Sequence, residues 1–527
     1  MPQTLTYPGI YVEEVPSGVH PIAGASTSDT AFVDYFARGP VGIATRVTSL
    51  AEHEQLFGGP DPSSAASYAV RLFFQNGGQV AWIVRVLPGN DAAPATANLS
   101  GGSPTQTKLA VSAANPGQWG SNLQVAATKT LPAVAGTFNL FVREHVPDGV
   151  GGFRDTRSEV FRNLTVTPGP NNAVDVVNAS SALVSLTDSS GGELPQLATP
   201  QSNGEPPPNS WIPLQNGHDA TVFDNSGNAA SDFAGKLQGG LAALDRIQPF
   251  RFNILCLPAT ARLVLTDAKA TIDMAAQYAG SKGAFAIVDP PPNLEGATAA
   301  QNWLLGTNGP TPTSYGAVYF PRVLMADPLA AGRQVEVGPS GLVAGIYTRT
   351  DAARGTWKAP AGIDATLIGA VPAQPLNDAD SGQLNPIAIN ALRTYPVIGS
   401  VVWGARTLFG ADQRASEWKY IPVRRMALYI ENSLVDSLGW VVFEPNDEPL
   451  WAQIRLNVGA FMQDLFRQAA FQGQTPKDAY LVKCDRTTTT QTDIDKGVVN
   501  IIVGFAPLKP AEFVVIQIQQ LAGQSQS

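Results

Sequence analysis

The sequence predicts a multidomain protein of the mixed α/β and α+β classes, and three observations support this fold class. With 527 residues, and about 150 residues per domain as a guide, the chain can form three or four domains. Segments typical of strands and helices alternate in residues 25–90 and again in residues 216–390. Between them, residues 91–215 carry short alternating runs separated by clusters of Pro, Gly, Asn, Ser and Thr, which predict a small β-rich domain with exposed loops.

The first α/β segment, residues 25–90, is expected to pack with the core of the second. Its pattern predicts a strand, a short helix, a longer helix and a second strand, at residues 30–36, 49–57, 63–76 and 79–87. Gly77 and Gly78 directly follow the longer helix and are typical of a helix end.

The second α/β segment, residues 216–390, repeats this alternation. Helices are predicted at residues 233–244 and 266–280, and apolar strands at residues 252–257 and 284–289. Because helices separate the strands along the chain, we expect a mostly parallel sheet.

Residues 391–510 are expected to form a C-terminal α+β domain. Its clearest element is a helix at residues 450–472, with Asp447 and Glu448 at its start and Gly473 at its end. Six apolar side chains of this helix recur every three or four residues and share one face: Trp451, Ile454, Val458, Phe461, Leu465 and Ala469. Strands are predicted at residues 479–484 and 498–505.

Both chain ends are predicted to be extended arms, at residues 1–24 and 511–527. Four prolines keep the first arm out of helix, and the strand-forming residues 9–15 lie between them. Residues 512–518 form a similar strand-like run after Pro507 and Pro510. A strand outside its own domain can pair with the open edge of a neighbour's sheet. Pairing of the first strand within its own domain is the alternative.

The composition argues against a nucleic-acid-binding protein and against a secreted or membrane protein. The net charge is −9 and no long Lys/Arg block occurs. Cys256 and Cys484 are too few and too far apart for a disulfide framework, which fits folding in a reducing cytoplasm. The first residues lack the basic and apolar regions of a signal peptide, and no apolar run approaches the ~20 residues that span a bilayer.

Charged residues make up only 15% of the chain, compared with about 25% in ordinary globular proteins. Two interpretations stay open. The surface is rich in uncharged polar residues, or much of it is buried in an assembly.

No enzyme motif is evident. The four histidines, His20, His53, His145 and His218, lack metal-ligand spacing and are interpreted as solvent-facing loop residues. Ser340 lacks the Gly-x-Ser-x-Gly spacing of a nucleophile elbow, and His218-Asp219 is better explained as a turn. The sequence contains no Gly-x-x-x-x-Gly-Lys-Ser/Thr loop for phosphate. We therefore expect no catalytic site, no metal and no cofactor.

Spaced motifs in one order resemble a known family. They are TYPGIYVEE (6–14), FAIVDP (285–290), SGLVAGIYTRTD (340–351), RGTWKAPA (354–361), LNP (384–386), INALR (389–393), VWGARTL (402–408), VRR (423–425), FEPN (443–446) and APLKPAEF (506–513). The chain resembles the tail sheath proteins of contractile phages, pyocins and extracellular contractile injection systems. The resemblance is dense at residues 6–90 and 235–520, whereas only NPGQWGSN (115–122) carries it in the β-rich segment.

The resemblance implies a subtilisin-like α/β topology for the central domain without protease activity. It also implies a subunit that polymerises as stacked hexameric rings around an inner tube and contracts to drive that tube through a target envelope. The implied partners are further copies of the chain, the inner tube protein, and baseplate and terminator or cap proteins. Assembly in the bacterial cytoplasm, into a virion tail or an extracellular tail-like particle, is expected. A subtilisin-like hydrolase and a surface adhesin are the alternatives.

Strand exchange between subunits follows from the two arms and from the resemblance. The donor residues are Gly9, Ile10, Tyr11, Val12, Glu13 and Val15 in the first arm, and Glu512, Phe513, Val514, Val515 and Ile516 in the second. The acceptor strand comprises Val498, Asn500, Ile501, Ile502 and Val503.

Five basic residues are candidate contacts to the tube or to another subunit: Arg424, Arg425, Arg455, Arg467 and Lys477. Arg424 and Arg425 are expected just before a helix that ends near Leu438, and an intrachain carboxylate is their alternative partner.

Overall fold

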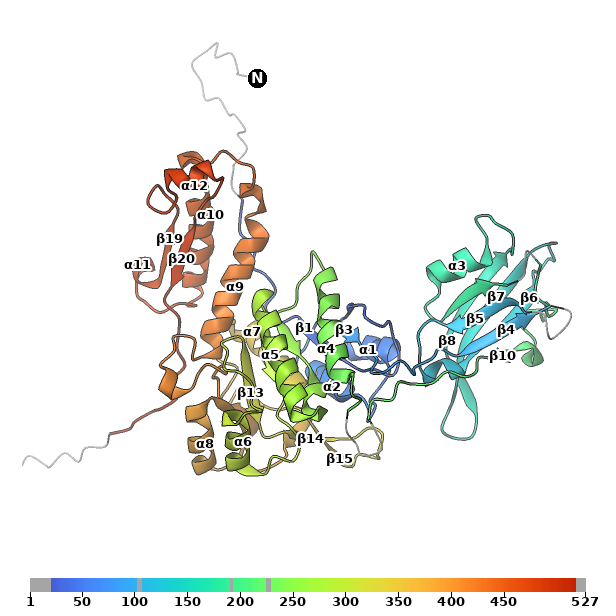
Figure 1. The fold of residues 1–527 in the computed structure, drawn as a ribbon, viewed down its shortest axis with the longest axis horizontal. Coiled ribbons are helices and arrows are strands. Elements are labelled where there is room, and N and C mark those ends of the chain that lie inside the picture. The colour runs from blue at the N-terminus through green and yellow to red at the C-terminus, as the bar shows by residue number, and fades with distance from the viewer. Residues whose placement is uncertain (1–19, 102–106, 190–192, 224–228, 518–527) are drawn as a thin grey trace, which may run out of the picture. The chain divides into compact units, whose positions relative to one another are not determined.

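The computed structural model describes residues 20–101, 107–189, 193–223 and 229–517. It divides the chain into two compact units. The central unit comprises residues 26–354 and 359–421, and the C-terminal unit comprises residues 1–25, 355–358 and 422–527. Figure 1 shows the fold and labels many of the helices and strands.

An eight-stranded sheet forms the centre of the central unit, in the order β18-β17-β13-β12-β11-β1-β3-β2. Its strands are β1 (Thr30–Asp34), β2 (Thr45–Val47), β3 (Ala81–Arg85), β11 (Ile254–Cys256), β12 (Phe285–Val288), β13 (Gly316–Phe320), β17 (Ile389–Tyr395) and β18 (Gly399–Trp403). The six inner strands are parallel, and only β2 and β18, at the two edges, run antiparallel to their neighbours. The expected mostly parallel sheet is therefore confirmed.

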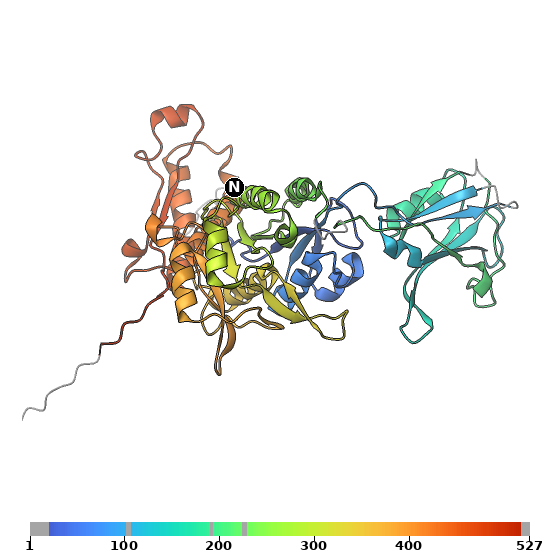
Figure 2. The ribbon, with the colours of Figure 1, turned by 60° about the horizontal axis from the view of Figure 1, so that its bottom comes forward.

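Helices cover both faces of this sheet. α4 (Phe233–Leu241) and α5 (Leu265–Ser281) pack on one face, where Val33, Val84 and Leu255 form part of the shared core. α2 (Ala65–Gln75) and α7 (Ser340–Arg354) lie on the other face, where the ring of Phe32 meets that of Phe73. Figure 2 shows green helix α4 and blue helices α1 (Leu50–Phe57) and α2 on opposite sides of the central strands.

The C-terminal boundary differs from the expectation at residue 391. β17 pairs with β13 and belongs to the central sheet, and the C-terminal unit resumes only at Pro422. The first five residues of β17 are buried, as in a strand covered on both faces, so this run continues the core of the central unit. Residues 362–367 cover the outer edge of β18, because the Gly362 and Leu367 amides donate to the Val402 and Ser400 carbonyls.

Smaller elements complete the central unit. α6 (Gly296–Leu305) and α8 (Asp378–Leu384) enclose a further apolar cluster with β13 and β17. β14 (Val323–Ala326), β15 (Gln334–Val337) and β16 (Ala370–Pro372) form a three-stranded sheet.

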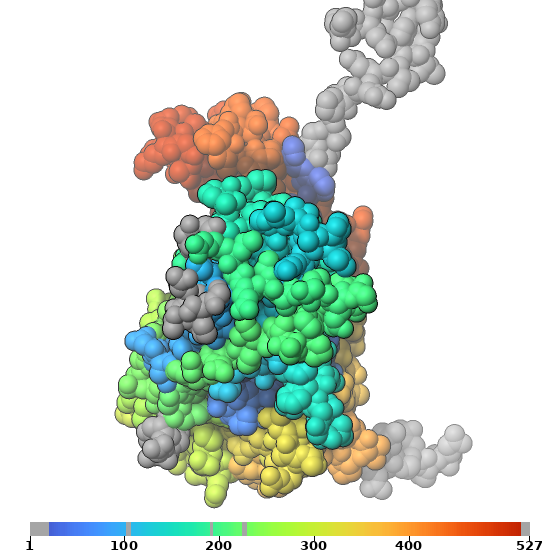
Figure 3. Space-filling model, turned by 90° about the vertical axis from the view of Figure 1, so that its right-hand side faces the viewer, coloured from blue at the N-terminus to red at the C-terminus, as the bar shows by residue number. Residues whose placement is uncertain are grey.

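The segment expected to be β-rich forms two sheets around a core of its own. One sheet contains β4 (Thr96–Ser100), β5 (Thr107–Ala113) and β9 (Val184–Asp188). The other contains β10 (Ile212–Pro213), β6 (Leu123–Lys129), β7 (Phe138–Pro147) and β8 (Phe153–Leu164). α3 (Ala173–Ser180) adds Ala173 and Val177 to the core that the two sheets share. Figure 3 shows the surface of one face of this segment, with residues up to β9 in blue to blue-green and residues after β9 in green.

The C-terminal unit is built on two long helices, α9 (Ile421–Ser437) and α10 (Glu448–Arg467). Five of the six residues predicted for the apolar face of the second helix form the core with Met426 and Ile430 of α9. The sixth, Ala469, lies beyond the end of α10 and is exposed. The short helices α11 (Pro476–Ala479) and α12 (Gln491–Asp495) and the strands β19 (Tyr480–Lys483) and β20 (Ile502–Phe505) follow. α10 ends at Arg467 instead of Gln472, because the chain turns at Ala469 with φ of 58°.

None of the helices within the described residues is long and apolar enough to cross a bilayer.

Candidate assembly site

β19 and β20 form a small antiparallel sheet in the C-terminal unit, with Val482 opposite Val503. Tyr480, Val482, Val503 and Phe505 pack against the core around α10. On the opposite face, Leu481 is 54% exposed and Ile502 is 50% exposed. The alternation of side chains along the two strands therefore gives this sheet one covered face and one apolar face in contact with solvent.

Both edges of this sheet are open. Among the described residues, β19 and β20 pair only with each other. The Ala506 amide donates to the Ala479 carbonyl at 2.8 Å, so these two residues are a hydrogen-bonded pair and the next pair along, Tyr480 with Phe505, is not. By this alternation, Val482 and Val503 direct their backbone groups away from the ladder. A two-stranded sheet is marginally stable by itself and gains from added strands.

The acceptor strand is shorter than expected. Of the predicted acceptor residues, only Ile502 and Val503 lie in β20, whereas Val498, Asn500 and Ile501 precede it. Other groups already bond the backbone there. The Val498 amide donates to Asp493 O at 2.8 Å, its carbonyl accepts from Asn446 Nδ2 at 3.0 Å, and the Asn500 amide donates to Thr489 Oγ1 at 3.0 Å. The sequence analysis predicted β19 but missed its open edge, because only the three-dimensional ladder shows which edge is unpaired.

Only the second of the two predicted donor segments lies within the described residues. Gly9, Ile10, Tyr11, Val12, Glu13 and Val15 lie outside the described residues. Glu512 to Ile516 are described and lie outside any helix or strand. The four apolar side chains from Phe513 to Ile516 are between 76% and 83% exposed. Such a contiguous apolar run in contact with solvent marks a segment for binding to another surface.

The tail leaves the C-terminal unit from a fixed point close to β20. The Gln472 amide donates to Ala506 O at 2.9 Å, and Phe471 forms a bridge with Pro507. Pro510 follows three residues later. The exposed apolar run begins at Phe513, six residues after Pro507, which the bridge to Phe471 holds against the unit.

The basic residues predicted to contact the tube lie in different environments. Arg424 and Arg425 are inside α9 instead of before it, and both are buried. Arg424 lies 3.6 Å from the Glu431 carboxylate, which is an intrachain partner. Arg455 donates to Glu448 at 2.6 Å and to the carbonyl of Cys484.

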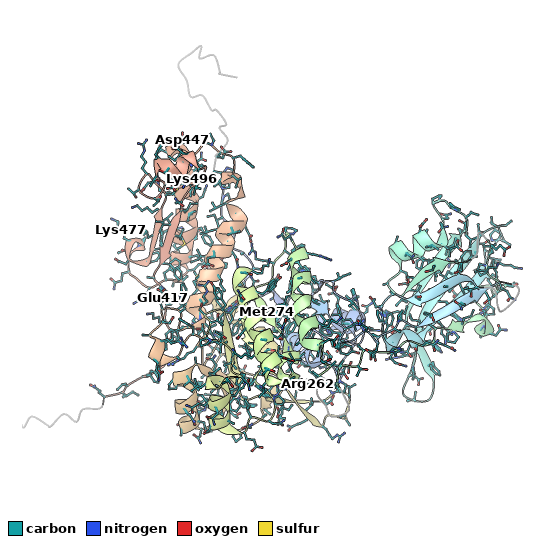
Figure 4. The ribbon with its side chains drawn as sticks, in the orientation of Figure 1. Arg262, Met274, Glu417, Asp447, Lys477 and Lys496 are labelled. Carbon is teal, nitrogen blue, oxygen red and sulfur yellow. The ribbon has the colours of Figure 1, made fainter. Side chains whose placement is uncertain are left out.

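Two of the five basic side chains are exposed. Arg467 lies 3.6 Å from the Asp464 carboxylate at the end of α10, and both side chains are in solvent. Lys477 lies in α11 at the surface of the C-terminal unit (Figure 4). The structure therefore leaves Arg467 and Lys477 as the accessible members of the predicted set.

The residues considered for hydrolysis are not brought together. Ser340 is the first residue of α7 and is fully buried, and its hydroxyl donates to Asp289 Oδ2 at 2.6 Å. Burial raises the pKa of the Asp289 carboxyl, against the hydrogen bonds from Ser340. His218 is exposed, and its Nδ1 lies 3.5 Å from the carbonyl of Asp219. The serine hydroxyl therefore serves a helix start in the interior and faces no substrate.

The interpretation of the histidines as solvent-facing loop residues is wrong for His145, which is half-buried in β7, and for His53. His53 lies in α1 and is buried against the rings of Phe36 and Phe57. Burial lowers the pKa of its imidazole to about 3, so the ring is neutral at physiological pH. Its apolar neighbours explain the burial, since this helix contributes one face to the core of the central unit. Within the described residues, no group of three or more His, Cys, Asp or Glu side chains is placed to hold a metal ion.

Comparison with known sequences gives two matches. Residues 413–520 match the family of phage tail sheath C-terminal domains. The tail sheath protein of Vibrio phage KVP40 is 28% identical over 182 residues, which cover 34% of this chain and 25% of the relative. The matched part thus spans about a quarter of that relative's length.

Solved structures match over nearly the whole chain. The PVC sheath complex of an extracellular contractile injection system, in its contracted state, has a TM-score of 0.57 at 21% identity and covers 98% of each chain. The contracted helical sheath of the anti-feeding prophage has a TM-score of 0.57 at 23% identity, over 98% of this chain and 100% of that chain. A sheath tail protein of Listeria innocua has a TM-score of 0.61 at 13% identity, over 93% and 96%.

At these identities the structural likeness shows a common fold. It extends through both units, whereas the family match is confined to the C-terminal part. Together, the match over residues 413–520, the relative in Vibrio phage KVP40 and the shared fold support the assignment of this chain to the tail sheath protein family.

Proposed function

We propose that the chain is a non-enzymatic structural subunit of a contractile sheath. It polymerises as stacked hexameric rings around an inner tube and contracts to drive that tube through a target envelope. The observation that carries the proposal lies in the C-terminal unit, which combines a two-stranded sheet open at both edges with an exposed apolar tail. The shared fold with contractile sheath complexes supports it.

Donated strands would join the subunits. The tail at residues 512–516 and the strand-like run at residues 9–15 add to the open edges of β19 and β20 in neighbouring copies. Each new backbone hydrogen bond contributes only about 1 kcal/mol net, so about four to six bonds per arm form a moderate joint. Repetition through the lattice holds the sheath together while the bodies of the subunits rotate about the arms.

The central unit would supply the bulk of the wall. Numbered within the sheet, its strand order is 2-3-1-4-5-6-7-8 from the β2 edge, with helices on both faces, which supports the proposed subtilisin-like topology. The hydrogen bond from the buried Ser340 hydroxyl to Asp289 supports a structural, non-catalytic role for this serine. The β-rich segment between β3 and α4 would lie on the outside of the sheath.

The remaining partners are proposed from the same assignment. The sheath would meet a baseplate at one end and a terminator or cap protein at the other, and it would be assembled in the bacterial cytoplasm into a virion tail or a tail-like particle. A structural match to a chain of the anti-feeding prophage baseplate complex supports the first contact. Arg467 and Lys477 are the proposed contacts to an acidic inner tube. Reversing both charges should leave cylinders that lack a tube, and retention of the tube would rule these contacts out.

Negative-stain microscopy of the purified full-length chain tests the proposal directly. Ordered cylinders are expected, and deletion of residues 1–15 or 512–527 should abolish them while leaving a folded subunit. A discrete trimer with a distal binding tip would instead favour an adhesin. Cylinders of normal length from either truncated chain would contradict strand donation.

A further inference from the structure

The last residues of the predicted N-terminal arm, together with Ala25, lie along α9 in a defined register. The Ala23 amide donates to Ser437 Oγ at 3.2 Å, and the Ala25 amide donates to Ser433 Oγ at 2.9 Å. Ser433 and Ser437 are one helical turn apart, about 6 Å along the axis. Alternate amides of an extended chain are about 6.6 Å apart. The two repeats match, so an extended segment running antiparallel to α9 can bond with both serines.

Side chains in the first half of this segment strengthen the contact. The ring of His20 stacks on Trp440 with centroids 4.4 Å apart, and the His20 amide donates to Asn457 Oδ1 at 3.3 Å. Ile22 packs against the core of the C-terminal unit. After Ile22, at Gly24, the chain lies against α9 more closely than most residues allow.

Gly24 makes that close approach possible. A Cβ atom at position 24 would overlap the hydroxyl of Tyr429. With Tyr429 in its observed position, only glycine fits there while the neighbouring amides reach the serines, and a larger residue would displace the Tyr429 hydroxyl.

We infer that this face of α9 and its surroundings is an arm-docking surface, formed by Tyr429, Ser433, Ser437, Trp440 and Asn457. Its occupant is residues 20–25 of the same chain, named here the arm root. The surface fixes the point from which the N-terminal arm departs and stores additional arm length. This inference rests on the proposed function, because stored length matters only if the arm is donated to another copy.

The stored length can be bounded from the chain geometry. With the root docked at His20, residue 15 can move at most about 17 Å from its anchor, at about 3.5 Å per residue. Release of the root moves the anchor to Ser26, whose hydroxyl donates to Asn253 Oδ1 at 2.9 Å within the central unit. Six more residues then become free, and the reach grows by about 20 Å.

The docked root should release before a donated strand does. Three hydrogen bonds from backbone amides to side chains hold it, at 2.9 to 3.3 Å. A donated strand would be held by a longer ladder of backbone pairs. When subunits move apart during contraction, the root therefore detaches from α9, and the joint between subunits survives.

Hydrogen exchange on the full-length chain tests the docking surface. In the free subunit and in extended sheaths, the amides of Ala23 and Ala25 should be protected. In contracted sheaths they should exchange at least about tenfold faster. In the free subunit, Ser433→Ala with Ser437→Ala should remove this protection. The control Ser381→Ala changes a half-buried serine in α8, whose hydroxyl donates to Asn377 O at 3.1 Å, and should leave it unchanged. Equal protection in extended and contracted sheaths, or no effect of the double variant, would overturn the inference.

A reversible disulfide between the arm root and α9 distinguishes failure of this inference from failure of the proposed function. Ala25→Cys with Ser433→Cys replaces the two residues joined by the shortest of the three hydrogen bonds, and mass spectrometry reports formation of the disulfide. The natural Cys256 and Cys484 are buried and do not interfere. Oxidised sheaths should assemble but contract by less than half the normal shortening, and a reductant should restore contraction. Full contraction of the oxidised sheaths would refute stored length. Failure of the wild-type chain to form cylinders would instead refute the proposed function.

Discussion

Two buried aspartates show how single residues tie the central sheet to its helices. Asp34 ends β1, and its Oδ2 accepts a hydrogen bond from the Ala66 amide at the start of α2, at 2.9 Å. Asp289 follows β12, and its Oδ1 accepts from the Ser340 amide at the start of α7, at 2.7 Å. Each carboxylate satisfies an amide that the first helical turn leaves without a partner. The contact of a serine with an aspartate here is therefore a helix cap, not a part of a catalytic triad.

Asp34 should make the stability of the protein depend on pH. Burial raises the pKa of its carboxyl from 3.8 to about 7. Between these values the folded state holds a proton that the unfolded state has lost, so the free energy of unfolding falls as pH rises from about 4 to about 7. The total loss is expected to be about 2–4 kcal/mol. Urea denaturation at several pH values measures it.

The matched variants are Asp34→Asn and Asp447→Asn. Asparagine at position 34 has no proton to lose and should flatten the pH dependence, whatever its effect on absolute stability. Asp447 is the N-cap residue of α10, and no hydrogen bond from its side chain to the helix is present, so its replacement should retain the wild-type slope. Equal slopes in wild type and Asp34→Asn would show that other groups cause the pH dependence.

Glycines in the helices provide a second test at the scale of single residues. A Cβ atom on Gly341 of α7 would overlap the backbone carbonyl of Ala69 in α2. Gly341→Ala should therefore push the two helices apart and lower the free energy of unfolding by about 1–3 kcal/mol. Gly235 of α4 has open space around its Cα, so Gly235→Ala should raise it by about 0.5–1 kcal/mol. Denaturant unfolding measures the free energy of unfolding of both variants. If both substitutions change it by the same amount and with the same sign, the close packing of Gly341 against Ala69 is not the cause.

At the scale of elements, the sequence predicted which helices and strands exist better than where they end. The 3.6-residue repeat from Trp451 onward identified α10 and its buried face. Its end was missed, because Ala469 adopts a left-handed conformation that alanine does not signal. β20 is shorter than its apolar run because Asn446 and Thr489, distant in sequence, bond with residues 498 and 500. Tertiary hydrogen bonds set these ends, and no local pattern reveals them.

The open edges of the small sheet can be blocked individually. Val503 directs its amide away from β19, so Val503→Pro should remove a donor from the open edge of β20 without breaking a ladder hydrogen bond. The subunit should fold and remain monomeric. Cylinder formation should fall about tenfold or more, because a loss of about 1.4 kcal/mol at each joint weakens binding tenfold. Val482→Pro should do the same at the β19 edge. Circular dichroism and microscopy report folding and assembly.

A substitution on the exposed face of the same sheet is the control. Leu481→Thr removes an apolar side chain but leaves both backbone edges intact, so strand addition should continue. If Val503→Pro and Val482→Pro both assemble as the wild type does, then β19 and β20 do not accept donated strands. If Leu481→Thr alone prevents assembly, side-chain burial on this face, and not edge pairing, joins the subunits.

At the scale of the whole molecule, the order of the segments was predictable but one boundary was not. Alternating strands and helices indicated the parallel sheet, and the Pro/Gly-rich region indicated the inserted β-rich segment. Residues 391–403 were placed with the C-terminal domain because they follow the alternating region directly. The pairing of β17 with β13 and of β18 with β17 puts them in the central sheet instead. A single sequence contains no signal for which of two neighbouring cores receives an apolar strand.

Contraction of isolated sheaths should release heat and should need no nucleotide. In the proposed sheath, the energy for contraction would be stored in the extended lattice, and the sequence contains no Gly-x-x-x-x-Gly-Lys-Ser/Thr motif. Contraction would bury apolar surface between the bodies of the subunits, and this burial becomes exothermic at elevated temperature. Scanning calorimetry of extended sheaths should therefore show an exotherm at a temperature below that of the unfolding endotherm. Its size should be several kcal/mol per subunit, on the order expected from a few hundred Å² of new contact. Val503→Pro subunits, which should not assemble, should show the endotherm alone. An athermal transition, or one that requires ATP, would mean that the sheath is not a metastable lattice.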